Sequence, residues 1–224
     1  MSRVYVPRID LSTQNQIHLV AADRKDPVGS ELLILPAWLS VPEEHAQRLV
    51  LKMDPGSAFG TGSHPTTRLC LEALEAAPPR GLRVADLGCG SGVLGLAALG
   101  LGAREVLAVD TDSLAVRATS ENAVLNNLAP GALRVRQGSL ETLEPLLTGK
   151  PADLLLCNIL APVIEALAPG FQSILSANGR GLLSGLLVEQ APRLTEVLEV
   201  LGWSVQALGS QGRWGLLEIR RQAP

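Results

Sequence analysis

Aromatic residues are scarce in this sequence: Phe, Trp and Tyr make up 3% of its 224 residues. Hydrophobic residues nevertheless reach 46%, which indicates a folded chain with a core of aliphatic side chains. The net charge is also small, −3 at pH 7. The overall charge therefore gives no general attraction to nucleic acid, and we expect no direct nucleic-acid partner.

Long apolar runs and paired cysteines are also missing. No apolar stretch approaches the roughly 20 residues of a membrane-spanning helix, and the N-terminus lacks the apolar region of a secretion signal. Cys70, Cys89 and Cys157 are odd in number and far apart, which argues against a disulfide framework or a C-x-x-C pair. We expect a cytoplasmic protein without membrane contact or metal; the oligomeric state stays open.

The first quarter of the chain reads as a short β-rich segment, residues 1–53. No long helical period occurs before residue 64, and turn residues such as those at 26–29 separate short apolar runs. A glycine-rich segment, residues 54–67, follows, and we expect the catalytic domain to occupy residues 65–224. The β-like runs of the first quarter lie at residues 3–6, 17–21, 31–35 and 48–53.

From Pro65 onward, strand and helix patterns alternate. Proline suits a first helical turn, and apolar positions follow it at helical spacing, so a helix is expected at residues 65–76. Strands that alternate with helices indicate a parallel sheet covered on both faces. The further strands are expected at residues 82–87, 105–110, 133–137, 153–158 and 181–184, and the further helices at residues 92–101, 112–126, 162–176 and 190–201.

The last two β-like runs, residues 203–208 and 214–220, are joined by a short polar link. Such a link is too short for a parallel crossover, so the two strands should pair antiparallel. The pattern predicts an α/β fold: a Rossmann-like, doubly wound sheet that ends in an antiparallel hairpin and follows a small β-rich segment. This architecture resembles that of class I methyltransferases.

The most informative motif is a glycine-rich turn after an apolar strand: residues 84–92 read Val-Ala-Asp-Leu-Gly-Cys-Gly-Ser-Gly. Such a turn lets the backbone approach a nucleotide-type ligand, here at Gly88 and Gly90. Asp110 ends the next apolar run, where a carboxylate can hold a ribose. Asp86 precedes the turn and is expected to face the pocket and accept hydrogen bonds from a ligand ammonium.

The glycine motif alone leaves the ligand open. Gly90, Gly92 and Gly95 also fit the dinucleotide pattern G-x-G-x-x-G, although this triplet begins late relative to the strand. A nicotinamide site and a tight turn that binds nothing are therefore alternatives. Asp86 together with Asn158 favours S-adenosylmethionine, with S-adenosylhomocysteine as the product.

Asn158 is the candidate catalytic residue. It ends an apolar strand, and the carboxyl end of a buried parallel strand lies beside the ligand crevice. Amino-directed methyltransferases carry Asn or Asp here, whose carbonyl accepts N–H bonds from the substrate. This chain keeps the Asn but continues with Ile-Leu-Ala instead of Pro-Pro-aromatic. The alternative is that Asn158 only caps the helix near Pro162.

Three further residues are candidate cofactor contacts. The glycine-rich segment suits a flap, in which Phe59 could cover the methionine end of the cofactor and Thr67 could bond its carboxylate. Ser139 follows the third strand of the sheet, where topology alone would put the adenine edge; a plain loop is the alternative. His64 could be taken for a general base, but a lone loop histidine is more often a structural hydrogen-bonding residue.

Three stretches carry a specific resemblance: residues 54–67, Asp86-Leu-Gly-Cys-Gly-Ser-Gly and Asn158-Ile-Leu-Ala. Over about residues 31–224 the chain resembles the bacterial methyltransferases of the eleventh large-subunit ribosomal protein. The resemblance implies methylation of lysine ε-amino and N-terminal α-amino groups on that protein. It also implies cofactor contacts at Thr67, Gly88, Asp110 and Asn158.

Members of that family carry a longer N-terminal recognition domain than the short stretch before residue 31, so a shortened N-terminal region is expected here. Another protein, a peptide or a small amine is therefore an alternative acceptor. A cofactor-binding protein without catalytic activity is a third hypothesis.

Overall fold

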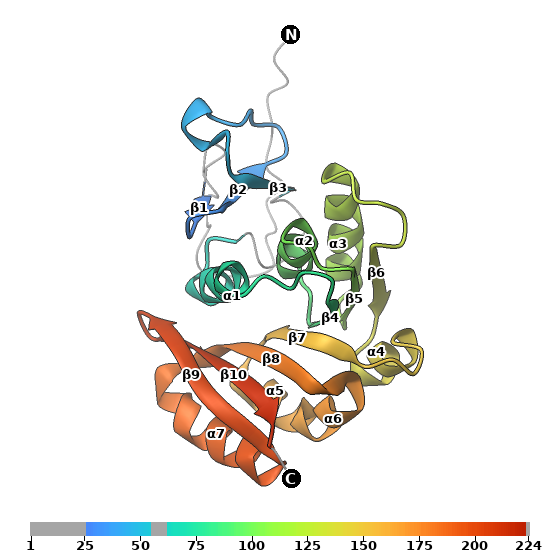
Figure 1. Cartoon of the computed structure of the whole chain (residues 1–224), viewed down its shortest axis with the longest axis vertical. Helices are drawn as coiled ribbons and strands as arrows, with labels where there is room; N and C mark the ends of the chain where they lie inside the picture. Colours follow the sequence, from blue (N-terminus) through green and yellow to red (C-terminus); the bar gives the residue numbers. More distant parts are fainter. Residues whose placement is uncertain (1–25, 55–61, 223–224) are drawn as a thin grey trace, which may run out of the picture.

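The computed structural model describes residues 26–54 and 62–222. These residues form a seven-stranded sheet and a separate three-stranded sheet. Figure 1 shows the small sheet beyond α1 and α2, on one side of the large sheet. The strands expected at residues 3–6 and 17–21 and the candidate residue Phe59 lie outside the described residues.

The large sheet has the strand order β6-β5-β4-β7-β8-β10-β9, and its first five strands run parallel. Chain order reverses between β4 and β7, which places a ligand crevice at the carboxyl ends of these two strands. The doubly wound sheet expected from the sequence is confirmed. Its strands are β4 (Arg83–Leu87), β5 (Glu105–Asp110), β6 (Leu133–Gln137), β7 (Ala152–Asn158), β8 (Leu175–Leu187), β9 (Trp203–Gln211) and β10 (Trp214–Arg221).

The expected C-terminal antiparallel hairpin is also confirmed. β10 pairs antiparallel with both β8 and β9, so the last strand of the chain lies between them. The register of β10 against β8 shifts between Gly215 and Leu217.

Helices cover both faces of the large sheet. Alternate strand residues enter two separate cores, for example Val84 on one face and Ala85 on the other, because strand side chains alternate between faces. Figure 1 shows α1 to α3 on the side of the small sheet and α5 to α7 on the opposite side. The helices are α1 (Pro65–Ala76), α2 (Val93–Gly100), α3 (Ser113–Leu125), α4 (Leu140–Leu146), α5 (Ala161–Leu167), α6 (Phe171–Ile174) and α7 (Ala191–Val200).

Several boundaries differ from those expected. The single helix expected at residues 162–176 is divided into α5, a 3₁₀ turn at Ala168–Gly170 and α6, since Pro169 and Gly170 both disfavour a continuous helix. β8 extends well beyond the expected residues 181–184. α4 was not predicted; it is short and has Pro145 inside it.

The small sheet contains β1 (Asp26–Val28), β2 (Leu32–Pro36) and β3 (Leu49–Met53), with a 3₁₀ turn at Glu43–His45 before β3. β1 pairs antiparallel with β2, and β2 pairs parallel with β3. The residues read from the sequence as a turn at 26–29 are therefore mostly strand. The turn follows at Gly29, whose φ is 52°.

Glu75 of α1 attaches this small sheet to the rest of the domain. Its carboxylate accepts hydrogen bonds from the amides of Ser30, Glu31 and Leu32 at 3.0, 3.0 and 2.7 Å. Three successive amides around one carboxylate form a compact anion site. The β1–β2 turn is therefore fixed against the end of α1. No helix in the described part of the chain is long and apolar enough to cross a membrane.

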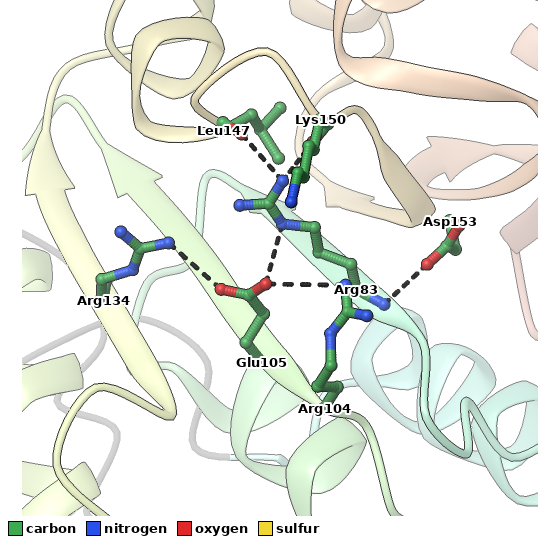
Figure 2. Close-up of polar contacts among 7 residues, drawn as sticks. All are labelled: Arg83, Arg104, Glu105, Arg134, Leu147, Lys150 and Asp153. Carbon is green, nitrogen blue, oxygen red and sulfur yellow. Dashed lines mark hydrogen bonds and ion pairs between the residues drawn. The ribbon is translucent and has the colours of Figure 1, made fainter.

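At the amino ends of β4 and β5, Arg83 forms a buried ion pair (Figure 2). Its Nε lies 3.0 Å from Oε1 of Glu105, and the side chain of Arg83 is 4% exposed. Nη1 of Arg83 also donates to the carbonyls of Leu147 and Lys150. This network links β4 and β5 to the loop after α4. It lies at the end of the sheet opposite the ligand crevice.

Replacing Glu105 should therefore affect stability. In Glu105→Gln the buried guanidinium of Arg83 loses its counter-charge, and we expect the free energy of unfolding to fall by about 2 kcal/mol. Urea unfolding followed by circular dichroism measures this change. Arg104→Gln is the matched control, because the more exposed Arg104 lies 3.7 Å from the same carboxylate; it should cost about 0.5 kcal/mol or less. Equal losses in the two variants would contradict the role given to burial.

Candidate functional site

The glycine turn follows β4 and is held by the end of β5. The amides of Gly88 and Cys89 both donate to the carbonyl of Val109, at 2.9 and 3.1 Å. Gly88, Gly90 and Gly92 have φ values of 77°, 56° and 81°, a left-handed region that other residues rarely adopt. The turn therefore needs glycine at these positions for its own conformation.

Asp110 bonds the glycine turn through one carboxylate oxygen and the start of α3 through the other. Oδ2 accepts a hydrogen bond from the amide of Gly90 at 2.9 Å, and Oδ1 accepts one from the amide of Asp112 at 3.0 Å. The side chain lies at the carboxyl end of β5, as expected from the sequence, but its bonds to the backbone were not predicted. Each carboxylate oxygen can accept more than one bond, so the same group can also accept the hydroxyls of a ribose.

Asp86 lies deeper than the sequence suggested. Its side chain is directed against α2, where Oδ2 accepts a hydrogen bond from the amide of Gly95 at 3.1 Å, and the residue is 2% exposed. Burial raises the pKa of Asp86 to about 7; the Gly95 bond opposes this shift and the nearby charge of Asp110 adds to it. A Cβ at Gly95 would lie 3.0 Å from both Asp86 Oδ2 and Val106 Cγ1, so glycine lets α2 approach this carboxyl group.

Asn158 and Thr67 meet at the carboxyl end of β7. Asn158 Nδ2 donates to Thr67 Oγ1 over a long 3.4 Å, and Thr67 is buried in the first turn of α1. The N-cap of α5 is Leu160, and no side chain bonds at that cap. The alternative that Asn158 caps the following helix is therefore wrong. The structure instead brings together two of the predicted site residues.

The residue after Asn158 is packed between two glycines. A Cβ at Gly88 would lie 2.4 Å from Ile159 Cγ2, and a Cβ at Gly185 would lie 2.3 Å from the carbonyl oxygen of Ile159. Both glycines are therefore needed for the ends of β4, β7 and β8 to meet. Gly185 was not identified from the sequence, although a glycine inside a strand is a known sign of close backbone approach.

His64 has the structural role preferred in the sequence analysis. It is the N-cap of α1, and its Nδ1 accepts a hydrogen bond from the amide of Thr66 at 3.4 Å. Its ring packs edge-on against Trp214, with centroids 4.9 Å apart. These contacts connect the start of α1 to the C-terminal hairpin.

Ser139 lies after β6, at the N-cap position of α4, and its amide donates to Glu141 Oε1 at 2.8 Å. The amide of the preceding Gly138 donates to the carbonyl of Asp110 at 2.9 Å. The end of β6 is therefore connected to the end of β5. This arrangement puts Ser139 on the same edge of the sheet as the glycine turn.

Two residues of α3 that contact the glycine turn were missed in the sequence. Thr119 Oγ1 donates to the carbonyl of Gly90 at 3.0 Å, and Asn122 Nδ2 donates to the carbonyl of Ser91 at 2.9 Å. Both residues are buried. The sequence did carry a signal for these contacts, because both residues are polar and lie within a helix that was expected to be amphipathic.

The chemistry of this edge fits a cationic ligand that carries a ribose. Within residues 26–54 and 62–222, no basic side chain forms an ion pair with Asp86 or Asp110. Two carboxylates without a cation favour a positively charged ligand and disfavour a pyrophosphate. The same ranges contain no cluster of His, Cys, Asp and Glu that could hold a metal ion.

Known proteins are similar to this chain in sequence and in fold. The family model described as ribosomal protein L11 methyltransferase (PrmA) matches residues 26–222. A protein named ribosomal protein L11 methyltransferase from Parasynechococcus marenigrum is 73% identical over 197 residues, 88% of this chain and 68% of the relative. One of the same name from Prochlorococcus marinus MIT 9303 is 68% identical over 199 residues, 89% and 66% of the two chains. The chain thus spans about two thirds of these relatives.

Solved structures agree with the family match. The ribosomal protein L11 methylase of Lactobacillus delbrueckii subsp. bulgaricus superposes with a TM-score of 0.77 at 33% identity, covering 89% of this chain and 99% of that one. The DhpI structure, a complex with S-adenosylhomocysteine, shares the fold with a TM-score of 0.56 at 20% identity, covering 70% and 84%. The family match sets aside the two alternatives that the glycine motif left open, a nicotinamide site and a turn that binds nothing. The chain belongs to the ribosomal protein L11 methyltransferase family, which uses S-adenosylmethionine.

Proposed function

We propose that this chain transfers methyl groups to amino groups of the large-subunit ribosomal protein L11, at lysine side chains and at the N-terminus. The observation that best supports this proposal is the contact of Asn158 with Thr67 beside the glycine turn. The names of the relatives support the choice of acceptor. A ribosomal acceptor would place the enzyme in the cytoplasm.

The residues at this edge would hold S-adenosylmethionine, which supplies a methyl group on a sulfonium that a neutral amine can accept. Asp110 would accept the ribose hydroxyls, and the backbone at Gly88 and Gly90 would allow close approach of the ligand. Asp86 would stabilise the cationic methionine end through charge. Thr67, Ser139 and Phe59 complete the proposed set, with the roles expected from the sequence.

The acceptor amine must be neutral when it reacts. Deprotonating a lysine with a pKa of about 10.4 costs about 4–5 kcal/mol at pH 7, whereas an α-amino group costs about 1 kcal/mol. Removal from water lowers an amine's pKa further, so a dedicated base is not required. The site then has to aim the lone pair of the nitrogen.

Asn158 is suited to that task. Its Nδ2 is directed to Thr67 Oγ1, which leaves Oδ1 to accept an N–H bond from the amine. The amide orientation follows from this hydrogen bond. Two carbonyl groups, Oδ1 and the main-chain oxygen, could thus orient the amine and stabilise the positive charge that it gains.

The acceptor can be tested directly. The enzyme and a cofactor that carries a labelled methyl group are incubated with three kinds of acceptor in parallel reactions: large-subunit ribosomal proteins, short peptides and free amines. We expect label in L11, at a rate at least about tenfold above that of the free amines, because positioning favours the cognate acceptor. Equal labelling of free amines would support the small-amine alternative. Absence of label in every acceptor would contradict methyl transfer by this chain.

Asp110→Ala should weaken cofactor binding. The variant loses a charged acceptor for the ribose and also the hydrogen bond that Asp110 accepts from the Gly90 amide. We therefore expect the Kd for the cofactor to rise about tenfold to a hundredfold. Calorimetry with S-adenosylhomocysteine measures this. Asp112→Ala is a matched control that removes the α3 cap at Leu114; it should reduce stability but leave Kd within about twofold.

Asn158→Ala should reduce turnover more than cofactor affinity. If the amide aims the amine, kcat for L11 should fall on the order of a hundredfold, while Kd for the cofactor changes by only a few-fold. Single-turnover kinetics and calorimetry separate the two quantities. Proportionate losses in both would show that Asn158 serves mainly to hold the cofactor.

A further inference from the structure

The helix α3 carries a row of polar side chains on its inner face. Thr119 and Asn122 are 0% and 1% exposed, and Asn126 at the end of the helix is partly buried. Threonine and asparagine disfavour helix interiors because their side chains compete for backbone groups. Buried polar groups of this kind must find hydrogen-bond partners. Their partners lie in two segments far apart in the sequence.

The first segment is the glycine turn. Asn122 Nδ2 donates to the carbonyl of Ser91, and Thr119 Oγ1 donates to the carbonyl of Gly90. α3 also approaches the turn closely, since a Cβ at Gly92 would lie 2.9 Å from Thr119 Oγ1. The conformation of the turn therefore depends on these side chains as well as on its glycines.

The second segment is β3, an edge strand of the small sheet. The amide of Lys52 donates to Asn126 Oδ1 at 2.9 Å, and Asn126 Nδ2 donates to the carbonyl of Lys52 at 2.7 Å. Two residues further on, the amide of Asp54 donates to Asn122 Oδ1 at 2.9 Å. Edge strands leave alternate backbone groups unpaired. The two asparagines, one helical turn apart, satisfy these groups as a neighbouring strand would.

We propose that Asn122 is a positioning residue for the cofactor. One side-chain amide joins the Ser91 carbonyl of the turn to the Asp54 amide at the end of β3, so it sets the distance between these segments. Asn126 bonds β3 and the main-chain carbonyl of Asn122, but no group of the turn. It therefore attaches the small sheet to α3 without a bond of its own to the glycine turn. Cofactor binding at the turn and the attachment of Asp54 are then coupled, and such coupling acts equally in both directions.

The variants Asn122→Ala, Asn126→Ala and Ser120→Ala test this assignment in the full chain. Ser120 is an exposed residue of α3 whose hydroxyl bonds Val116 within the helix, and it serves as the matched control. Calorimetry with S-adenosylhomocysteine should show Kd about tenfold weaker for Asn122→Ala and within about twofold of wild type for the other two.

Equal loss of affinity in Asn122→Ala and Asn126→Ala would overturn the proposal, because it would indicate general loosening of the small sheet. An unchanged Kd in Asn122→Ala would also overturn it.

A second measurement uses the wild-type chain and does not depend on the folding of any variant. In hydrogen exchange, S-adenosylhomocysteine should slow exchange of the Asp54 amide more than that of the Leu32 amide. Leu32 belongs to the same small sheet but donates to Glu75. An equal response at the two amides would refute the coupling. Neither measurement involves a methyl acceptor, so both remain informative if the proposed acceptor is wrong.

Discussion

The close packing of Ile159 against Gly88 and Gly185 is the constraint on which the site depends. β7 lies between β4 and β8; β4 and β7 end just before this contact, and β8 passes it near its own end. A Cβ on Gly88 or on Gly185 would overlap atoms of Ile159, so neither position has room for a side chain. The position of Asn158, the residue before Ile159, relative to the glycine turn is therefore set by the Ile159 side chain against Gly88 and by the Ile159 backbone against Gly185. The side-chain contact with Thr67 only completes this arrangement.

The order and type of most elements could be predicted because their apolar patterns are regular. β5 and β6 have the predicted bounds, and β7 differs by one residue. The exceptions arise from tertiary contacts. Residues 177–180 read as a loop, yet they belong to β8, whose pairs with β7 lie on both sides of a register shift there and whose pairs with β10 begin at Arg180. Pairing with two neighbours overrides weak local propensity.

The candidate site was predictable to a similar degree. Asp110 and Asn158 were identified because each ends an apolar strand, and strand ends meet at one edge of a parallel sheet. The orientation of Asp86 towards α2 was not predicted, since a strand pattern does not distinguish a residue at the crevice from one beneath it. The bonds of Asn122 and of Glu75 were also missed. They join a side chain to the backbone of a remote segment, and such bonds leave no periodic pattern in a sequence.

The strand order divides the sheet into two blocks that are each continuous in the chain. β4, β5 and β6, with Asp86 and Asp110, come from residues 83–137, whereas β7 to β10 come from residues 152–221. The two sides of the crevice at the ends of β4 and β7 therefore come from different stretches of the chain, and the parallel pairing of β4 with β7 brings them together. Beyond the last pair of these two strands, Gly88 of the first block lies against the side chain of Ile159 of the second.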